Sequence, residues 1–250
     1  MGQQQQPRGR ALKKKLRELL QYGSFEETIG EILSYPLRLA INPLFGFLLS
    51  TDSLLRWRAI RAMARVVDRI AQEEMESARI IIRRLMWQLN DESGGIGWGC
   101  PEAIGEILAV NRNLAEEFAS LLISYIREDG NFLEHEPLQA GAVWAAGRLA
   151  QAWPDLAKDA ESHLLAFLNS PVPEIRANTV WALGYVGTED LKDQLLPFTR
   201  DSSIVELYRD DQIRPTSVGQ LAREALVRIC SPRAPYNEIG GGQQKGKIIP

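Results

Sequence analysis

A seven-residue pattern that recurs along the chain is the feature that most constrains its fold. Segments 27–33 (ETIGEIL) and 102–108 (EAIGEIL) agree at six of seven positions, and related segments begin at positions 61, 144, 181 and 224. The second residues of these six segments are separated by 34, 41, 42, 37 and 43 positions. Periods of this length are typical of solenoids built from pairs of helices. The sequence therefore predicts an all-α superhelix of about six helical hairpins.

Small residues recur at the fourth position of the pattern. Five of the six segments have glycine or alanine there: Gly30, Ala64, Gly105, Gly147 and Gly184. Glycine inside a helix costs about 1 kcal/mol relative to alanine, so its recurrence needs a compensating reason. We expect each of these segments to lie in the second helix of a pair, with its small residue close to a neighbouring helix.

Helix starts and the first helices of the pairs can also be read. Ranges 11–22, 77–89, 114–126 and 156–168 have the apolar spacing of amphipathic helices. Two capping boxes, Ser24 with Glu27 and Ser217 with Gln220, predict helix starts. Three further starts are predicted by prolines that suit a first helical position: Pro101, Pro137 and Pro173.

One segment departs from the helical pattern. Residues 204–208 (IVELY) and 212–218 (QIRPTSV) are rich in β-forming residues and flank a short polar turn. This arrangement predicts a β-hairpin inserted between the two helices of the last pair. Pro215 favours an edge strand, because proline donates no hydrogen bond to a sheet.

Segment 173–187 (PEIRANTVWALGYVG) resembles a HEAT repeat of the bacterial HEAT-like type that also occurs in phycobilisome lyases. The resemblance rests on Pro173, on Ile175 followed by Arg176, on the alanines, and on Leu183 followed by Gly184. An apolar–arginine pair recurs at 55–56, and segment 83–108 resembles an uncharacterised group of bacterial HEAT proteins. The resemblance spans residues 11–230 and implies the fold, whereas HEAT arrays have many different functions.

Charge is distributed unevenly along the chain. The chain carries −3 overall, with +5 in residues 1–20 and +2 in residues 231–250, which leaves −10 for the body. An acidic body is a poor nucleic-acid platform, so we expect no nucleic-acid partner. We expect residues 1–10 to be a disordered basic arm, 11–230 the repeat domain, and 231–250 a disordered tail.

Compartment and covalent features are inferred from the same composition. The two cysteines, Cys100 and Cys230, are too few for a disulfide framework and fit a reducing compartment. The N-terminal segment lacks the apolar stretch of a signal peptide, and no apolar run is long enough to span a bilayer. We expect a soluble, cytoplasmic protein with no membrane partner.

The glycine-rich segment 93–99 (SGGIGWG) is the main candidate site. It lacks the spacing of a dinucleotide-binding loop, and two interpretations remain open: a turn between the helices of one pair, or a binding loop. In a solenoid, loops of successive repeats align, which would place it beside segment 132–137 (FLEHEP). The candidate binding residues on these neighbouring segments are Gly95, Gly97, Trp98, Cys100, Glu102, His135 and Glu136. For Glu102 the alternative is an ordinary solvated helix start.

The candidate residues and the single His–Glu pair favour a binding protein over an enzyme. We expect a non-enzymatic scaffold for a protein partner of unknown identity, with no cofactor and no metal. An alternative is a lyase-like or cofactor-handling chaperone, with Trp98, Cys100, His135 and Glu136 around a flat ligand. A metal-dependent enzyme is a third reading. HEAT-type deoxyhypusine hydroxylases bind iron through several His–Glu pairs, whereas this chain has one.

Tryptophans and arginines at matching repeat positions have a structural interpretation. Trp144 and Trp181 both precede the second residue of their segments, and this recurrence favours packing. Trp87 lies in a first helix, where we expect it in the core. Arg56 and Arg176 share a repeat position, and we expect both to donate hydrogen bonds that link turns.

Overall fold

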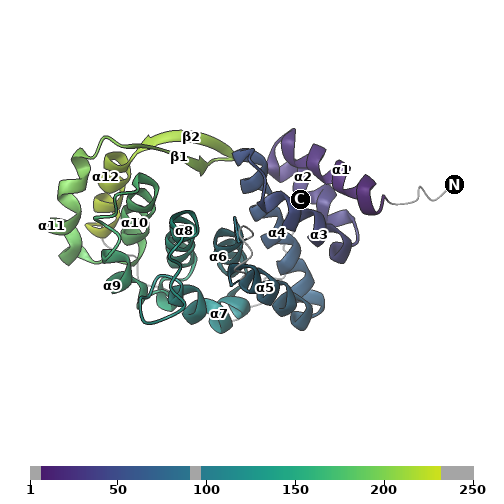
Figure 1. Ribbon diagram of the computed structural model, residues 1–250, viewed down its shortest axis with the longest axis horizontal. Coiled ribbons are helices and arrows are strands. Elements are labelled where there is room, and N and C mark those ends of the chain that lie inside the picture. Colours follow the sequence, from purple (N-terminus) through teal and green to yellow (C-terminus); the bar gives the residue numbers. More distant parts are fainter. Residues whose placement is uncertain (1–6, 91–96, 232–250) are drawn as a thin grey trace, which may run out of the picture.

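A computed structural model describes residues 7–90 and 97–231 of the chain. Figure 1 shows an arc of paired helices closed on one side by a β-hairpin. The longer helices, in chain order, are α1 (Gly9–Gln21), α2 (Phe25–Ser34), α3 (Leu37–Leu48), α4 (Ser53–Glu73), α5 (Met75–Leu89), α6 (Cys100–Val110), α7 (Arg112–Ser124), α8 (Glu136–Ala152), α10 (Pro173–Val186) and α12 (Val218–Ile229). The shorter elements are η1 (Pro154–Leu156), α9 (Ala160–Leu165), η2 (Glu189–Leu191), α11 (Lys192–Leu195), η3 (Leu196–Arg200), β1 (Ile204–Arg209) and β2 (Gln212–Ser217).

The helices form two layers. The inner helices, α4, α6, α8, α10 and α12, pack each against the next, while α5, α7, α9 and α11 lie on the outside of the arc (Figure 1). All six pattern segments fall in the second helix of a pair, as predicted. The all-α superhelix of about six helical hairpins, with a small β-hairpin near the C-terminus, is therefore confirmed.

Close packing between inner helices explains three of the recurring glycines. A β-carbon at Gly105 would lie 2.7 Å from Ala145 Cα, and one at Gly147 would lie 2.9 Å from Ala182 Cα. A β-carbon at Gly184 would likewise lie 2.9 Å from Ala225 Cα. Gly30 does not follow this rule, because nothing lies within 4 Å of its missing β-carbon. The first pair is therefore not stacked at this position as the others are.

Local sequence signals set the helix starts. The Ser24–Glu27 capping box is present at α2, and the Ser217 hydroxyl accepts a hydrogen bond from the backbone N–H of Gln220 at α12. Such contacts satisfy backbone donors that the first helical turn leaves free. The three prolines lie in the first turns of α6, α8 and α10.

One expected first helix is broken. The continuous helix expected over 156–168 is instead a 3₁₀ turn, η1, followed by the six-residue α9. Pro154 starts η1, and the Arg112 guanidinium pairs with Asp155 at 2.6 Å. Arg112 also lies 5.0 Å from the Trp153 ring centroid. These contacts hold the chain away from a continuous helical path.

The hairpin of β1 and β2, residues 204–217, is called the strap below. Its strands are antiparallel, and Arg209 pairs with Gln212 across a two-residue turn. Both turn residues, Asp210 and Asp211, have positive φ, as two-residue hairpin turns of type I′ require. The predicted hairpin and its position between the helices of the last pair are confirmed.

The ends of the chain are described only in part. α1 begins at Gly9, within the range expected to be a disordered arm, while residues 1–6 and 232–250 lie outside the described residues. The tail expected at 231–250 therefore falls almost entirely outside them. Across the described ranges, none of the helices combines the length and apolar character needed to cross a membrane.

Candidate binding groove

The strap is fastened to the opposite end of the arc by its turn. The Asp211 carboxylate accepts hydrogen bonds from Arg58 Nε at 2.8 Å and Arg58 Nη2 at 2.7 Å. It also accepts from the Phe25 backbone N–H at 2.9 Å and from the Tyr208 hydroxyl at 2.8 Å. Arg58 is buried within α4, and its Nη1 donates to the Leu20 carbonyl oxygen. The superhelix is thus closed into a ring (Figure 1).

These contacts change the ionisation of two strap residues. Burial has the largest single effect on the Asp211 carboxyl and would raise its pKa, but hydrogen bonds from Arg58, Phe25 and Tyr208 outweigh it. The pKa of Asp211 is therefore lowered. Burial, assisted by the Asp211 carboxylate, raises the pKa of Tyr208 to about 12, so its hydroxyl remains a donor at neutral pH.

Charged contacts fasten the strap to the last two inner helices, to α10 at its base and to α12 beside its turn. Arg176 of α10 donates to Asp201 at 2.9 Å and Ser203 at 3.0 Å, and also to the carbonyl oxygens of residues 170 and 171. Arg176 links two turns, as predicted. Arg209 of β1 pairs with Glu224 of α12 at 2.9 Å. Both ends of the strap are therefore held by charged contacts.

Aromatic side chains line the inner helices beneath the strap. The Trp57 ring lies edge-on to Trp144, with centroids 4.7 Å apart, and Trp144 stacks on Trp181 at 6.1 Å. From the strap, Tyr208 stacks on Trp57 at 5.7 Å. Trp144 and Trp181 pack on one another, as expected, and Trp57 joins them; each of the three is half-buried.

The three tryptophans also present unused hydrogen-bond donors. Within the described residues, the indole N–H groups of Trp57, Trp144 and Trp181 have no hydrogen-bond partner, and none of them is among the buried unsatisfied atoms. A buried donor without a partner would be costly. These donors therefore keep contact with solvent.

Two cavities lie under the strap and share Trp57, Trp144, Asn178 and Leu207 as common wall. We call the space formed by both the groove. The larger cavity, of about 540 Å³, is the polar cavity and extends toward Tyr185 and α12. Its charged lining residues are all engaged in ion pairs, for example Arg148 with Glu106 at 2.7 Å.

The smaller cavity, of about 310 Å³, has a different electrostatic character. We call it the acidic pocket. Its charged lining residues are Arg56, Glu102, Glu136, Glu174 and Glu206. With all five side chains charged, the net charge of the acidic pocket is −3. Across the described residues, none of these five side chains forms an ion pair within 4.0 Å or a hydrogen bond to another residue, and the Glu102 carboxylate has only its own backbone N–H as a donor. The linking role expected for Arg56 is therefore not observed.

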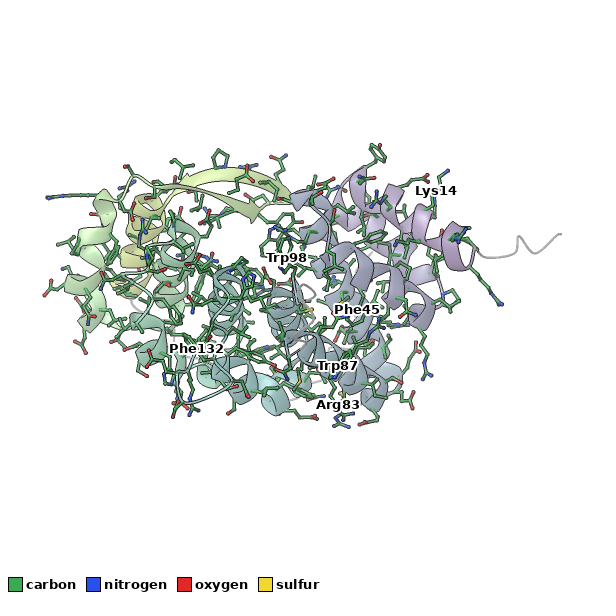
Figure 2. All side chains as sticks on the ribbon, in the orientation of Figure 1. Lys14, Phe45, Arg83, Trp87, Trp98 and Phe132 are labelled. Carbon is green, nitrogen blue, oxygen red and sulfur yellow. The ribbon has the colours of Figure 1, made fainter. Side chains whose placement is uncertain are left out.

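The structure brings part of the predicted site together at the edge of the groove. Trp98, 43% exposed, lines a cavity of about 150 Å³ with Arg56, Glu102 and Pro137, so the segments before α6 and α8 are adjacent as expected. Figure 2 shows Trp98 on the inner side of the arc, toward the strap. Glu102 and Glu136 share the acidic pocket.

The described glycines of the predicted loop have structural roles. Gly97 is buried, and a β-carbon there would lie 2.9 Å from Leu89 Cδ2. Gly99 precedes α6 with φ of 74°, a conformation that favours glycine. Gly95 lies outside the described residues. For Gly97 and Gly99, the turn interpretation accounts for the residue type.

Two other predicted site residues do not reach the groove. Cys100 lies in the core with no exposure, and its thiol donates to Gln88 Oε1 at 3.2 Å. His135 is exposed before α8 and lines none of the cavities described here. Among residues 7–90 and 97–231, no three His, Cys, Asp or Glu side chains are placed to hold a metal ion. Neither the flat-ligand nor the metal alternative gains support.

Cysteine accessibility gives a direct prediction. Burial is the main cause that raises the pKa of Cys100 to about 12, whereas Cys230 is exposed. Because the thiolate is the reactive form, we expect a thiol reagent at pH 8 to label only Cys230 in the native protein and both cysteines in denaturant. Peptide mapping by mass spectrometry measures this, and equal native labelling of both would contradict the burial of Cys100.

Not every tryptophan was placed correctly from the sequence, and the contact that closes the ring was not detected from it. Trp87 was expected in the core, but it is 69% exposed on the outer helix α5 (Figure 2). The shared repeat position of Trp144 and Trp181 was a usable signal, since it places both side chains on the same inner face. The Arg58–Asp211 pair had no local signal, because 153 residues separate its partners.

Comparison with known proteins agrees with this architecture. The HEAT-like repeat family matches residues 136–186. An uncharacterised protein of Archaeoglobus fulgidus is 30% identical over 188 residues, covering 73% of this chain and 93% of that protein. A designed armadillo repeat protein in complex with peptide (KR)4 superposes with a TM-score of 0.51 and 19% identity, over 87% of this chain and 91% of that chain. An archaeal HEAT-like repeats protein from Thermococcus onnurineus NA1 gives a TM-score of 0.39 and 14% identity, over 90% and 82% of the two chains.

Stacked helical hairpins around a shared inner face define an α-solenoid repeat protein. This chain belongs to the HEAT-repeat family. The resemblance to HEAT repeats is therefore confirmed, and the relative is archaeal, whereas the resemblance pointed to bacterial proteins.

Proposed function

We propose that the protein is a non-enzymatic scaffold that holds an extended segment of a partner protein in the groove. The observation that carries the proposal is the row of half-buried tryptophans under the strap, with three indole N–H groups that have no partner among the described residues. An extended backbone offers carbonyl acceptors at regular spacing, and aromatic faces supply apolar contact area. The designed armadillo repeat protein of similar fold is in complex with a peptide.

The candidate residues Trp98, Glu102 and Glu136 belong to this proposal as the edge of the groove. Trp98 is exposed beside the small cavity that adjoins the acidic pocket, where it supplies apolar area to a segment leaving the groove. Cytoplasmic location and a single repeat domain over 11–230 are part of the same proposal. They fit a chain whose described helices include no membrane span.

A random-peptide display library, panned against the purified full chain, tests the proposal. We expect selected peptides to bind, and Trp144→Ala to weaken their affinity about tenfold or more, as for a hot-spot tryptophan. Trp87→Ala is the matched control, because Trp87 is exposed on the outer layer.

A second variant separates loss of binding from loss of folding. Trp144 also stacks on its neighbours, so melting temperatures are compared for all variants. Leu207→Arg fills the groove from the strap without altering an inner helix, and we expect it to weaken peptide binding too. Failure to select any peptide, or equal losses in the groove variants and Trp87→Ala, would overturn the proposal.

A further inference from the structure

The acidic pocket differs from the rest of the groove in having charges without partners. In the polar cavity, each charged side chain has an opposite charge within 4.0 Å. In the acidic pocket, four carboxylates and one guanidinium lie around Trp57 and Trp144, and none is paired within the described residues. Arg56 and Glu102 are half-buried, whereas Glu136, Glu174 and Glu206 are exposed at the rim. Carboxylates grouped around aromatic faces attract an opposite charge supplied by a ligand.

The positions of three of these carboxylates are explained by the helix starts at which they lie. Glu102, Glu136 and Glu174 lie in the first turns of α6, α8 and α10, where negative charge is favourable. The fourth carboxylate, Glu206, is on strand β1, where no helix end explains it. The strap therefore adds negative charge to a row of acidic helix starts, on the side that faces the tryptophans.

Glu102 is the least exposed of the four glutamates, and its carboxylate lies in a recess beside Gly141. A β-carbon at Gly141 would lie 2.6 Å from a carboxylate oxygen of Glu102, so glycine at this position makes room for that carboxylate. Burial is the largest effect on its pKa, which is raised despite its own backbone N–H and the positive charge of Arg56. The carboxylate lies in the pocket and lacks a close cation.

We propose that the acidic pocket takes one cationic side chain, a lysine or arginine, of the bound partner segment. This inference rests on the proposed function and names the chemistry of the partner. Tryptophan faces attract cations, and carboxylates form strong charge-assisted hydrogen bonds with ammonium and guanidinium groups. A pocket of about 310 Å³ has room for one such side chain with its water.

Two eight-residue peptides of alternating lysine and serine, one free and one with every lysine acetylated, are the probes. Acetylation keeps the chain length and removes the charge. We expect the free peptide to bind the full chain about tenfold or more tightly than the acetylated one, by calorimetry or fluorescence anisotropy. We expect Glu102→Gln and Glu206→Gln each to remove much of this difference.

Glu189→Gln is the matched control, because Glu189 is an exposed acid at the start of η2, outside the groove. If Glu102→Gln, Glu206→Gln and Glu189→Gln reduce the preference for the free peptide equally, the peptide is attracted to the acidic body as a whole. That result would overturn the inference. Selection of groove-binding peptides without lysine or arginine would also overturn it, while leaving the proposed function intact. Failure to select any peptide would instead overturn the proposed function.

Discussion

Gly105→Ala is expected to lower the free energy of unfolding by about 1–3 kcal/mol, although alanine is the better helix former. The added methyl group would lie 2.6 Å from Ala145 Cβ and 2.7 Å from Ala145 Cα. The second contact is with backbone, so relief requires α6 and α8 to separate. Such overpacking outweighs the gain in helix propensity of about 1 kcal/mol. Thermal or urea unfolding measures the change.

Gly30→Ala is the matched control and should have the opposite sign. Gly30 occupies the same position as Gly105 in a nearly identical seven-residue segment, but its missing β-carbon faces open space. Alanine there should stabilise the protein by about 0.5–1 kcal/mol. The same change in stability for both variants would show that helix propensity alone governs these positions and that inner-helix packing is looser than described.

Asp211→Asn is expected to cost about 2–4 kcal/mol, because it leaves the buried Arg58 guanidinium without its counter-charge. The side chain of Arg58 is 7% exposed and that of Asp211 is 23% exposed, which places the effect below that of a fully buried pair. Asparagine preserves the size of the side chain and tolerates the positive φ of the turn. The variant therefore tests the charge of the strap contact and not its backbone geometry.

Asp210→Asn is the control for the same turn. Asp210 also has positive φ, but its side chain is exposed and lies 4.0 Å from Arg214. We expect a change within about 0.5 kcal/mol, as for other surface positions. If both variants lose equal stability, the Arg58–Asp211 pair does not hold the strap.

The lowered pKa of Asp211 also predicts a pH dependence. A carboxyl with a lower pKa in the folded state stabilises the fold above its unfolded pKa of about 3.9. That stabilisation is lost as pH falls through the folded value, so the wild type should lose stability below about pH 4. Asp211→Asn should lack this part of the acid loss, and identical pH profiles would contradict the assignment.

Repetition made most of the fold predictable. The seven-residue segments indicated the second helix of each pair, and the prolines and capping residues marked where helices begin, because these signals act within a few residues. The broken segment near Pro154 was missed, since its path depends on Arg112, some 43 residues earlier in the chain. Gly30 was misjudged because the repeat pattern does not reveal that the first pair lacks a closely stacked neighbour at that point.

The candidate site was predictable only in part. Trp98 and Glu102 lie at the groove edge because loops of neighbouring repeats do align. Burial of Cys100 and exposure of Trp87 depend on which face of each helix points to the core. Both helices carry apolar residues on more than one face, so the spacing of apolar residues does not identify the buried face. Closure of the ring by the strap joins residues 58 and 211, and no local pattern encodes so distant a contact.

The indole N–H signals of the six tryptophans offer the most direct test of the groove as the binding site. The full chain, labelled with nitrogen-15, would be titrated with a peptide selected by display and followed by two-dimensional NMR. Signals of Trp57, Trp144 and Trp181 should shift together with one affinity, while Trp87 on the outer layer should remain unchanged. A titration that moves Trp87 and leaves the three groove tryptophans in place would contradict binding under the strap.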